Sequence, residues 1–373
     1  MLIFFLIAFV TIKAQAMELT TFNVGLAYNY VALAEKRRPL IINKLKELKS
    51  DAVCLQEVWH EQDVEDFIVE TQKNFPYHAR TSPRQKYSKK RPPCFLHNLF
   101  GEGKFGTCLL SKCMKKKGDD LTSCVINSCQ SSLQKIKKDR PLCLEAIITQ
   151  VEKSKGKALL SLFNPFSPIK LFSYSGQAGI LLLSKHPLSN IKIQDYFEHS
   201  TSVRRAAILA KMNVKIGKEE EKITLGCTHL SANLEREVPY PGIYFNSWGE
   251  ENYWQMKEFL KNAMEYSEKN APIALMGDFN CALKGELEKS CRLPKELGFD
   301  VAGNDTGKTE CSYCKNNPLV HSTENFKIDH IFFKSMKERE SQVYLKELYP
   351  IEMNGLVPLS DHYAFKTKVE LKK

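Results

Sequence analysis

Residues 272–280 read PIALMGDFN, an apolar run of strand length that ends in an aspartate and an asparagine two positions apart. Two other stretches have the same form, AVCLQE at 52–57 and KITLGCTHL at 222–230. Each stretch predicts a buried strand that ends in a carboxylate, an amide or an imidazole. A rigid sheet built from such strands would present its polar residues at one rim.

Three shorter motifs extend this pattern toward both ends of the chain: TFN at 21–23, IDHIFF at 328–333 and SDH at 360–362. A single polar strand ending is a weak signal, because His229 or Asp329 alone is more often structural than functional. Six such endings in one chain favour a shared functional site.

The segments between the motifs predict an α/β protein whose helices cover two packed sheets of mixed strand order. Residues 34–49, with apolar side chains at helical spacing on a charged background, are typical of an amphipathic helix. Further helices are expected at 61–72 and 252–267, and further strands at 18–24, 180–184, 206–215 and 363–369. We expect one elaborated domain over residues 17–373 that is interrupted by an insertion at about 81–175.

The positive charge of the chain is concentrated in this insertion. The formal net charge is +11, and residues 81–170 hold 18 Lys and Arg against 6 Asp and Glu. Basic clusters such as KKR at 89–91 and KKK at 115–117 are interleaved with aromatic residues, including Phe95 and Phe166. The insertion could bind anionic lipid or nucleic acid phosphates, or it could be a solvated loop.

Twelve cysteines are typical of an oxidising compartment. Six of them lie in the insertion, which is otherwise rich in Lys, Ser and Gly, and they predict an internal disulfide framework of unknown pairing. Cys54 and Cys227 lie inside apolar strands, and we expect them to be small buried hydrophobic residues. For the CxxC pair Cys311 and Cys314, a disulfide is favoured over a zinc site, because no second close cysteine pair supplies the other ligands.

The first sixteen residues resemble a secretory signal, with an apolar run at 2–10 and the small-residue sequence AQA at 14–16. No basic residue precedes the apolar run, so a buried first strand or an uncleaved anchor is the alternative. The run is shorter than the roughly 20 residues that span a bilayer. We expect a secreted or periplasmic protein.

Oxygen ligands at the strand ends predict a site for a hard divalent cation, Mg2+ or Mn2+. Glu57 is the strongest candidate ligand, because a carboxylate at the end of an apolar strand is costly to bury unless positive charge meets it. Asn23 could complete the site through its amide oxygen.

The remaining motif residues are candidates for acid–base and phosphate chemistry. Asp278 could hold or activate a water while Asn280 donates to a phosphoryl oxygen, and His229 and His362 could transfer protons. Asp329 could orient His362. The neighbouring Arg204 and Arg205 could bind phosphate, or they could form a solvated strand edge.

These motifs resemble the endonuclease/exonuclease/phosphatase superfamily of metal-dependent phosphodiesterases over roughly residues 18–369, apart from the insertion. The resemblance implies a four-layer α/β/β/α sandwich of two mixed sheets, like that of deoxyribonuclease I. It also implies that Asn23 and Glu57 bind Mg2+, with Asp361 as a further acidic residue near the metal. The remaining roles that it implies are positioning of water and phosphate by Asp278, Asn280 and His229, and general base catalysis by His362 oriented by Asp329.

Within this superfamily the chain is most similar to the neutral sphingomyelinases, on the stretches LQEVWHEQD at 55–63, LLSKHPL at 182–188, CTHL at 227–230 and PLSDH at 358–362. This resemblance implies hydrolysis of sphingomyelin, a membrane phospholipid, to ceramide and phosphocholine. A secreted endonuclease acting on nucleic acid is the main alternative, and a catalytically inactive binding protein is a third. No obligate protein partner is expected.

Overall fold

The computed structural model describes residues 16–81, 94–151, 153–163, 172–216, 219–283, 288–303, 310–320 and 322–371. The predicted signal segment up to residue 15, the KKR cluster at 89–91 and Phe166 lie outside these residues. No helix in the described part of the chain combines the length and the apolar character needed to cross a bilayer.

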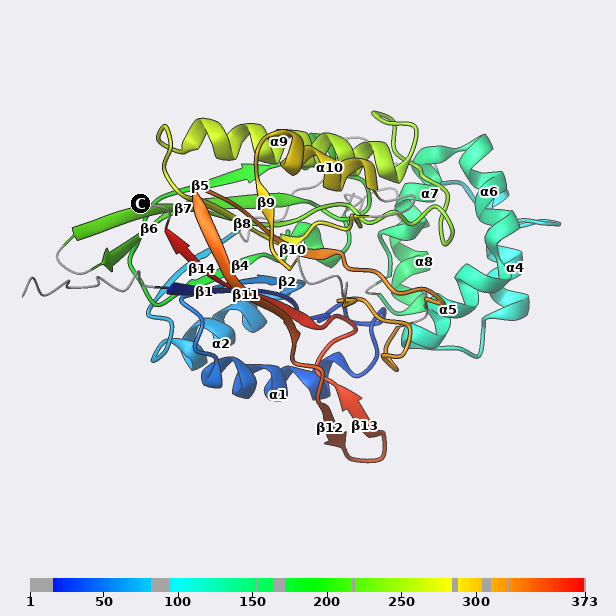
Figure 1. The fold of residues 1–373 in the computed structure, drawn as a ribbon. Coiled ribbons are helices and arrows are strands. Elements are labelled where there is room, and N and C mark those ends of the chain that lie inside the picture. Colours follow the sequence, from blue (N-terminus) through cyan, green and yellow to red (C-terminus); the bar gives the residue numbers. More distant parts are fainter. Residues whose placement is uncertain are drawn as a thin grey trace, which may run out of the picture.

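Two six-stranded mixed sheets form the centre of the molecule (Figure 1). The first has the order β11-β14-β1-β2-β4-β3, and the second has the order β5-β6-β7-β8-β10-β9. The first sheet comprises β1 (Ala16–Asn23), β2 (Ala52–Gln56), β3 (Tyr77–Arg80), β4 (Leu181–Ser184), β11 (Met336–Tyr344) and β14 (Ala364–Leu371). The second comprises β5 (Leu188–Asp195), β6 (Ala206–Ile216), β7 (Glu219–His229), β8 (Ile273–Asp278), β9 (Asp300–Val301) and β10 (Asp329–Lys334).

Helices cover the outer face of each sheet, which gives the four layers that the sequence predicted. α1 (Ala34–Glu47) and α2 (Glu61–Thr71) pack on the first sheet, and α9 (Trp248–Tyr266) and α10 (Glu288–Glu296) pack on the second. Along β2, Ala52 and Cys54 point between the sheets while Val53 and Leu55 point toward the helices. Burial on both faces explains why this strand reads as a continuous apolar run.

A disulfide between Cys54 of β2 and Cys227 of β7 links the two sheets through their shared core. The expectation that these cysteines are buried is confirmed, but they form a disulfide and do not serve only as small hydrophobic residues. Both are fully buried, but they face each other from opposite sheets although 173 residues separate them in sequence. Strand periodicity shows that each cysteine is buried, and it does not show which residue lies opposite.

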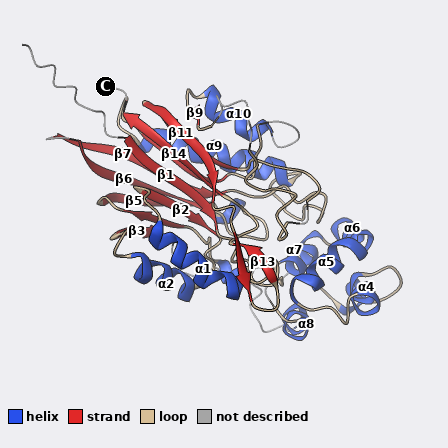
Figure 2. Ribbon diagram, turned by 60° about the horizontal axis from the view of Figure 1, so that its bottom comes forward, coloured by secondary structure: helices blue, strands red, loops and turns tan. Residues whose placement is uncertain are grey.

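The insertion is helical, and the predicted internal disulfide framework is confirmed. Its disulfides join Cys94 to Cys143, Cys108 to Cys129 and Cys113 to Cys124. Its helices enclose a separate apolar cluster and are α3 (Leu96–Leu99), α4 (Phe105–Lys112), α5 (Gly118–Ser128), α6 (Gln130–Asp139), α7 (Pro141–Ile148) and α8 (Lys155–Phe163). Figures 1 and 2 place them beyond one end of the sheets, the end toward which β2 runs.

A two-stranded hairpin of β12 (Leu348–Ile351) and β13 (Gly355–Pro358) projects near the same end of the sandwich (Figure 2). Its apolar residues Leu348, Met353 and Leu356 are exposed. This hairpin is not among the strands predicted from the sequence. Its strands are only four residues long, and they lack the alternating pattern of a half-buried strand.

Candidate active site

The strand pairing brings the predicted motifs to one rim of the sandwich. Asn23 ends β1, and Glu57 follows β2, the parallel neighbour of β1. In the second sheet, Asp278 lies opposite His229 in one strand pair and opposite Asp329 in the next. Tyr363 separates His362 from the first residue of β14, which pairs with β1.

Asp278 lies at the centre of the cluster and is almost completely buried. Its Oδ2 accepts a hydrogen bond from Asn23 Nδ2 at 2.9 Å, and it lies 3.5 Å from Nε2 of His229 and 3.8 Å from Nε2 of His362. Burial and then the charge of Asp329 raise the pKa of Asp278 to about 7. This carboxylate can therefore accept a proton near neutral pH.

His362 is bound by Asp329, with 2.8 Å between Nδ1 of the ring and Oδ2 of the carboxylate. Burial lowers the pKa of His362, but the charges of Asp329 and Asp278 outweigh it and hold the pKa well above its usual value. Asp329 itself is fixed because its backbone N–H donates to Ser312 Oγ. The hydrogen bond at Nδ1 orients the ring so that Nε2 faces the site.

Glu57 and Asp361 bring a second pair of negative charges to the rim. Burial and the charge of Asp361 raise the pKa of Glu57. Oε1 of Glu57 accepts from Asn23 Nδ2 at 3.2 Å, while its buried Oε2 has no hydrogen-bond partner among the described residues. The backbone of Glu57 is left-handed, with φ of 63°. Such strain in a non-glycine residue is typical of functional sites.

Gly25 makes room for Asp361. A Cβ atom at this position would lie 2.4 Å from Oδ1 of Asp361, and the φ of Gly25 is +57°. Oδ1 of Asp361 also accepts a hydrogen bond from Ser360 Oγ at 3.0 Å. A glycine is therefore needed for both the backbone conformation and the close approach of the carboxylate.

His229 and Arg205 form the opposite side of the cluster. Burial, together with the positive charges of Arg205 and His362, holds the pKa of His229 well below its usual value, so the ring is neutral. Burial also lowers the pKa of Arg205, against the opposing charges of Glu57 and Asp278. Nε and Nη1 of Arg205 are buried without a hydrogen-bond partner in the described part of the chain. These N–H groups are available to an oxyanion.

Arg204 differs from its neighbour. Its guanidinium forms a salt bridge with Asp195 at 2.8 Å and donates to the carbonyl of Gly176 at 3.1 Å. Both arginines are almost completely buried, so the alternative of a solvated strand edge is wrong. The prediction that both arginines could bind phosphate also needs correction for Arg204, because its donors serve Asp195 and Gly176.

Asn280 lies beside Asp278 in a left-handed conformation, with φ of 49°. Its backbone N–H donates to Oδ1 of Asp278 at 2.9 Å, and its side-chain amide donates to the carbonyl of Leu230 at 3.0 Å. The amide therefore joins the loops that follow β7 and β8. One N–H of the amide remains for a substrate oxygen.

The donor set fits a divalent cation. Glu57 and Asp361 supply oxygen atoms, and the partnerless Oε2 of Glu57 is the kind of buried group that a cation would satisfy. Asn23 currently turns its Nδ2 toward the carboxylates, while its Oδ1 accepts from the backbone of Gly25 at 3.0 Å. Rotation of this amide would present Oδ1 to the metal.

Arg37 stabilises the loops of the site, and the sequence did not predict this role. Its fully buried guanidinium donates to the carbonyls of Val24, Gly25 and Leu359. These bonds join the segment after Asn23 to the segment before Asp361. In sequence, Arg37 belongs to a charged helical run, which gives no sign that this one residue points inward.

Glu251 of α9 also stabilises loops of the site, and the sequence did not predict its role either. Its fully buried carboxylate accepts hydrogen bonds from Ser231 Oγ, from the backbone of Thr201 and from the hydroxyl of Tyr240. Ser231 follows His229 by two residues, and Thr201 precedes Arg205 by four. Glu251 therefore fixes two loops that carry site residues.

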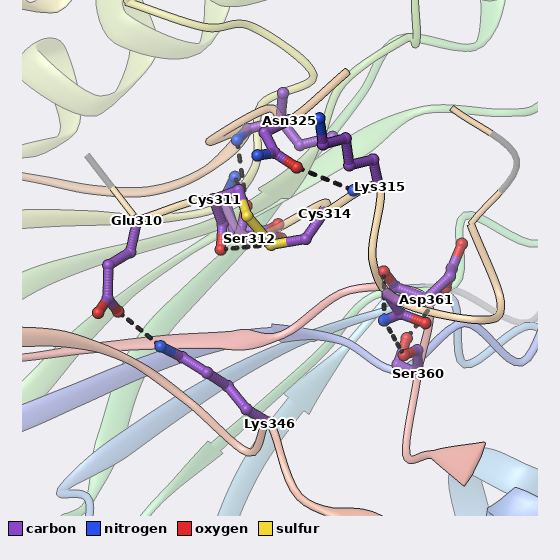
Figure 3. Close-up of a disulfide and its surroundings, with 12 residues drawn as sticks. Glu310, Cys311, Ser312, Cys314, Lys315, Asn325, Lys346, Ser360 and Asp361 are labelled. Atoms are coloured by element: carbon purple, nitrogen blue, oxygen red, sulfur yellow. Dashed lines mark hydrogen bonds and ion pairs between the residues drawn. A yellow bond between two sulfur atoms is a disulfide. The ribbon is translucent and has the colours of Figure 1, made fainter. Parts of the chain in front are cut away.

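The Cys311–Cys314 disulfide closes a loop next to the site, so the prediction of a disulfide in place of zinc is confirmed. Figure 3 shows this loop in one view with Ser360 and Asp361. Within the loop, Ser312 accepts hydrogen bonds from the backbone of residues 328 and 329. Its carbonyl also accepts from the backbone of Tyr363. The loop thus joins the segments that carry Asp329 and His362.

The sequence profile of the Endonuclease/Exonuclease/phosphatase family matches residues 20–362, so the chain belongs to this family. Members of the family are hydrolases that act on phosphodiester bonds and generally use divalent metal ions. A comparison with curated protein sequences found no match.

Solved structures have the same fold. A family protein from Bacteroides thetaiotaomicron is 11% identical, with a TM-score of 0.54, and the match covers 96% of this chain and 99% of that one. SmcL is 12% identical, with a TM-score of 0.54 and coverage of 95% and 99%. TDP2 from C. elegans is 11% identical, with a TM-score of 0.53 and coverage of 96% and 76%. At these identities the likeness concerns the fold.

Proposed function

We propose that this protein is a secreted, metal-dependent phosphodiesterase that hydrolyses sphingomyelin and releases phosphocholine. The observation that carries the proposal is the convergence at one rim of Glu57 and Asp361 with Asp278, His362 and Arg205. This arrangement combines a place for a cation, a proton acceptor and donors for a phosphoryl group.

Glu57, Asp361 and Asn23 would hold Mg2+, which Mn2+ could replace. The bound cation would neutralise negative charge on the phosphoryl oxygens. On the protein side, the buried Nε and Nη1 of Arg205 donate to the phosphoryl group, and the neutral ring of His229 adds a further donor.

Asp278 is the proton acceptor for the attacking water. As the bond from water oxygen to phosphorus forms, Asp278 takes the water proton. The bond from phosphorus to the ceramide oxygen then breaks, and Nε2 of His362 protonates the leaving oxygen. The raised pKa of His362 keeps it in the imidazolium form that this step requires, so we assign it as the acid and not as the general base that the resemblance implied.

Two features support a lipid substrate and secretion. Exposed apolar residues lie near the active-site end of the molecule, on the β12–β13 hairpin and on the insertion. All twelve cysteines are paired in disulfides, which favours an oxidising compartment. The apolar run at 2–10 supports secretion, and the sphingomyelinase-like motifs support the lipid substrate.

A secreted endonuclease is the second candidate. The observation in its favour is the excess of exposed lysines on the insertion, which would attract a nucleic acid backbone as readily as an anionic membrane. The phosphoryl chemistry at the rim would be the same for either substrate.

The test compares two substrates with the same oxidised protein and Mg2+. Phosphocholine release from sphingomyelin vesicles is measured in parallel with cleavage of supercoiled plasmid, with EDTA, His362→Ala and Glu57→Gln as negative controls. Glu347→Gln, which removes an exposed carboxylate of the same type as Glu57, is the matched control that should retain full activity. Metal-dependent phosphocholine release with intact plasmid supports the proposal, whereas plasmid cleavage with intact sphingomyelin overturns it in favour of the endonuclease.

A further inference from the structure

A cavity of about 100 Å³ opens on the insertion between α3, the start of α4 and α6. Figure 1 shows α4 and α6 at the outer end of the insertion, away from the sheets. The residues that line the cavity are His97, Asn98, Lys104, Ser132, Lys135, Ile136, Asp139 and Arg140. This cavity is separate from the catalytic rim.

Three of the lining residues, Lys104, Lys135 and Arg140, are permanent cations, against the single carboxylate of Asp139. Lys104 donates one of the three N–H groups of its ammonium to the carbonyl of His97. Within the described residues, Lys135 and Arg140 form no ion pair, even though Asp139 lines the same cavity. The cavity therefore presents positive charge that the protein does not neutralise.

Disulfides fix the walls of this cavity. Cys94–Cys143 joins the segment before α3 to α7, which directly follows Arg140. Cys108–Cys129 joins α4 to the start of α6. Because these bonds cross-link both sides of the cavity, the backbone that carries the cations is fixed before any ligand arrives, and binding would order mainly the side chains.

Two large apolar side chains lie exposed beside the cations. Phe95 is 52% exposed and Leu96 is 64% exposed. Phe95 stacks on the ring of His97 at 5.6 Å, and the guanidinium of Arg140 lies over it at 6.0 Å. Exposed apolar groups next to cations are typical of surfaces that lie at a bilayer interface.

We propose that this cavity binds the phosphate of an anionic phospholipid in a membrane, while Phe95 and Leu96 insert among the adjacent acyl chains. The cations would attract the lipid headgroup, and Phe95 and Leu96 would bury apolar surface among the acyl chains. One small surface would therefore contact both the headgroup and the chains of a lipid. The site would hold the enzyme on a membrane through a lipid that it does not hydrolyse. This proposal does not depend on sphingomyelin being the substrate.

A nucleic acid is the less favoured ligand. A backbone phosphate could enter the cavity, but the aliphatic Leu96 has no ring on which a base could stack. Contact with lipid chains would bury this side chain, whereas contact with a phosphate backbone would leave it exposed.

The test is cosedimentation of the full-length oxidised protein with vesicles of phosphatidylcholine, with or without phosphatidylserine, and plasmid binding by each variant is measured in parallel in EDTA. Neither lipid is sphingomyelin, so binding is measured without turnover of the proposed substrate. The first variant is Lys135→Ala combined with Arg140→Ala. Its control is Lys269→Ala combined with Lys337→Ala, which removes the same charge from exposed positions at the opposite end of the sandwich. A third variant, Leu96→Ser, leaves the charge unchanged.

We expect binding that requires phosphatidylserine and falls about 30-fold in the Lys135/Arg140 variant. The Lys269/Lys337 control should change it less than about threefold, and Leu96→Ser should weaken it without changing plasmid binding. Equal losses in the two double variants would show nonspecific attraction and overturn the proposal. Vesicle binding that is unchanged in the Lys135/Arg140 variant would overturn the proposal as well. A Lys135/Arg140 variant that loses plasmid binding but keeps vesicle binding would also overturn it. Phosphocholine release in detergent micelles, measured on the same variants, reports separately on the proposed catalytic function.

Discussion

The sandwich buries a large apolar core between and outside its two sheets, and one disulfide joins those sheets. The insertion at 94–163 buries one small cluster and contains three disulfides. The two regions also differ in charge, because the sandwich buries the ionisable groups of the site while the insertion exposes its lysines. The difference indicates that the sandwich carries the catalytic chemistry, whereas the insertion provides a charged surface for binding. The insertion is too small to be stabilised by its apolar core alone, and its disulfides stabilise it further.

The sharpest way to separate the two regions is His362→Ala. Loss of this proton donor should lower phosphodiester hydrolysis by about a thousandfold, while vesicle binding through the insertion stays at the wild-type level. Rates and cosedimentation on one preparation check both statements. Glu347→Gln, the exposed carboxylate control, should match the wild type in each assay.

Removal of the Cys94–Cys143 bond by serine substitution at both positions should loosen the insertion alone. A loop of 49 residues is closed by this bond, which corresponds to about 4 kcal/mol of chain entropy. Hydrogen exchange should accelerate in α3–α8 and stay unchanged in the sheets. Faster exchange in both regions would mean that the insertion and the sandwich unfold as one unit.

Glu145 lies where the insertion meets the sandwich, and it provides a pH-dependent test. Burial and the charge of Glu251 raise the pKa of Glu145 from 4.5 to about 7. The folded protein therefore holds a proton that the unfolded chain releases, so stability falls as pH rises between about 4.5 and 7. Glu145→Gln should leave the melting temperature unchanged at pH 4 and raise it at pH 8. The corresponding increase in the free energy of unfolding at pH 8 is at most about 3 kcal/mol. Equal melting temperatures at pH 8 would contradict this account.

The smallest expected effect comes from Gly25→Ala, which would press a methyl group against Asp361. The strained backbone and displaced carboxylate should raise the Mg2+ concentration needed for half-maximal activity by about tenfold. Gly156→Ala is the control, because a Cβ there meets no atom within 4 Å. A metal requirement equal to that of the wild type would show that Asp361 is not a ligand.

The sequence predicted the ends of β1, β2, β7 and β8, because apolar runs that stop at a polar residue are visible without knowledge of what lies opposite. It did not predict the pairing of Cys54 with Cys227, which depends on how two sheets face each other. Nor did it distinguish Arg204 from Arg205. Adjacent residues of an extended segment point to different sides, and only the position of Asp195 determines that Arg204, and not Arg205, forms the salt bridge.

The insertion was harder to predict in structural terms. Its composition indicated charge and disulfides, but its helices are at most eleven residues long and lack a sustained apolar stripe. Arg37 was missed for the opposite reason, because it lies in a helix that was predicted well. The carbonyl groups that it binds come from segments distant in sequence.

The most direct test of the account is the rate of bis(4-nitrophenyl) phosphate hydrolysis as a function of Mg2+ concentration, for EDTA-treated wild-type protein and for Glu57→Gln. We expect no activity without metal, full recovery of the wild type with Mg2+ or Mn2+, and a much higher metal requirement for the variant. Hydrolysis that persists in EDTA, or a variant whose metal dependence matches the wild type, would contradict the assignment of the rim as a metal-dependent phosphodiesterase site.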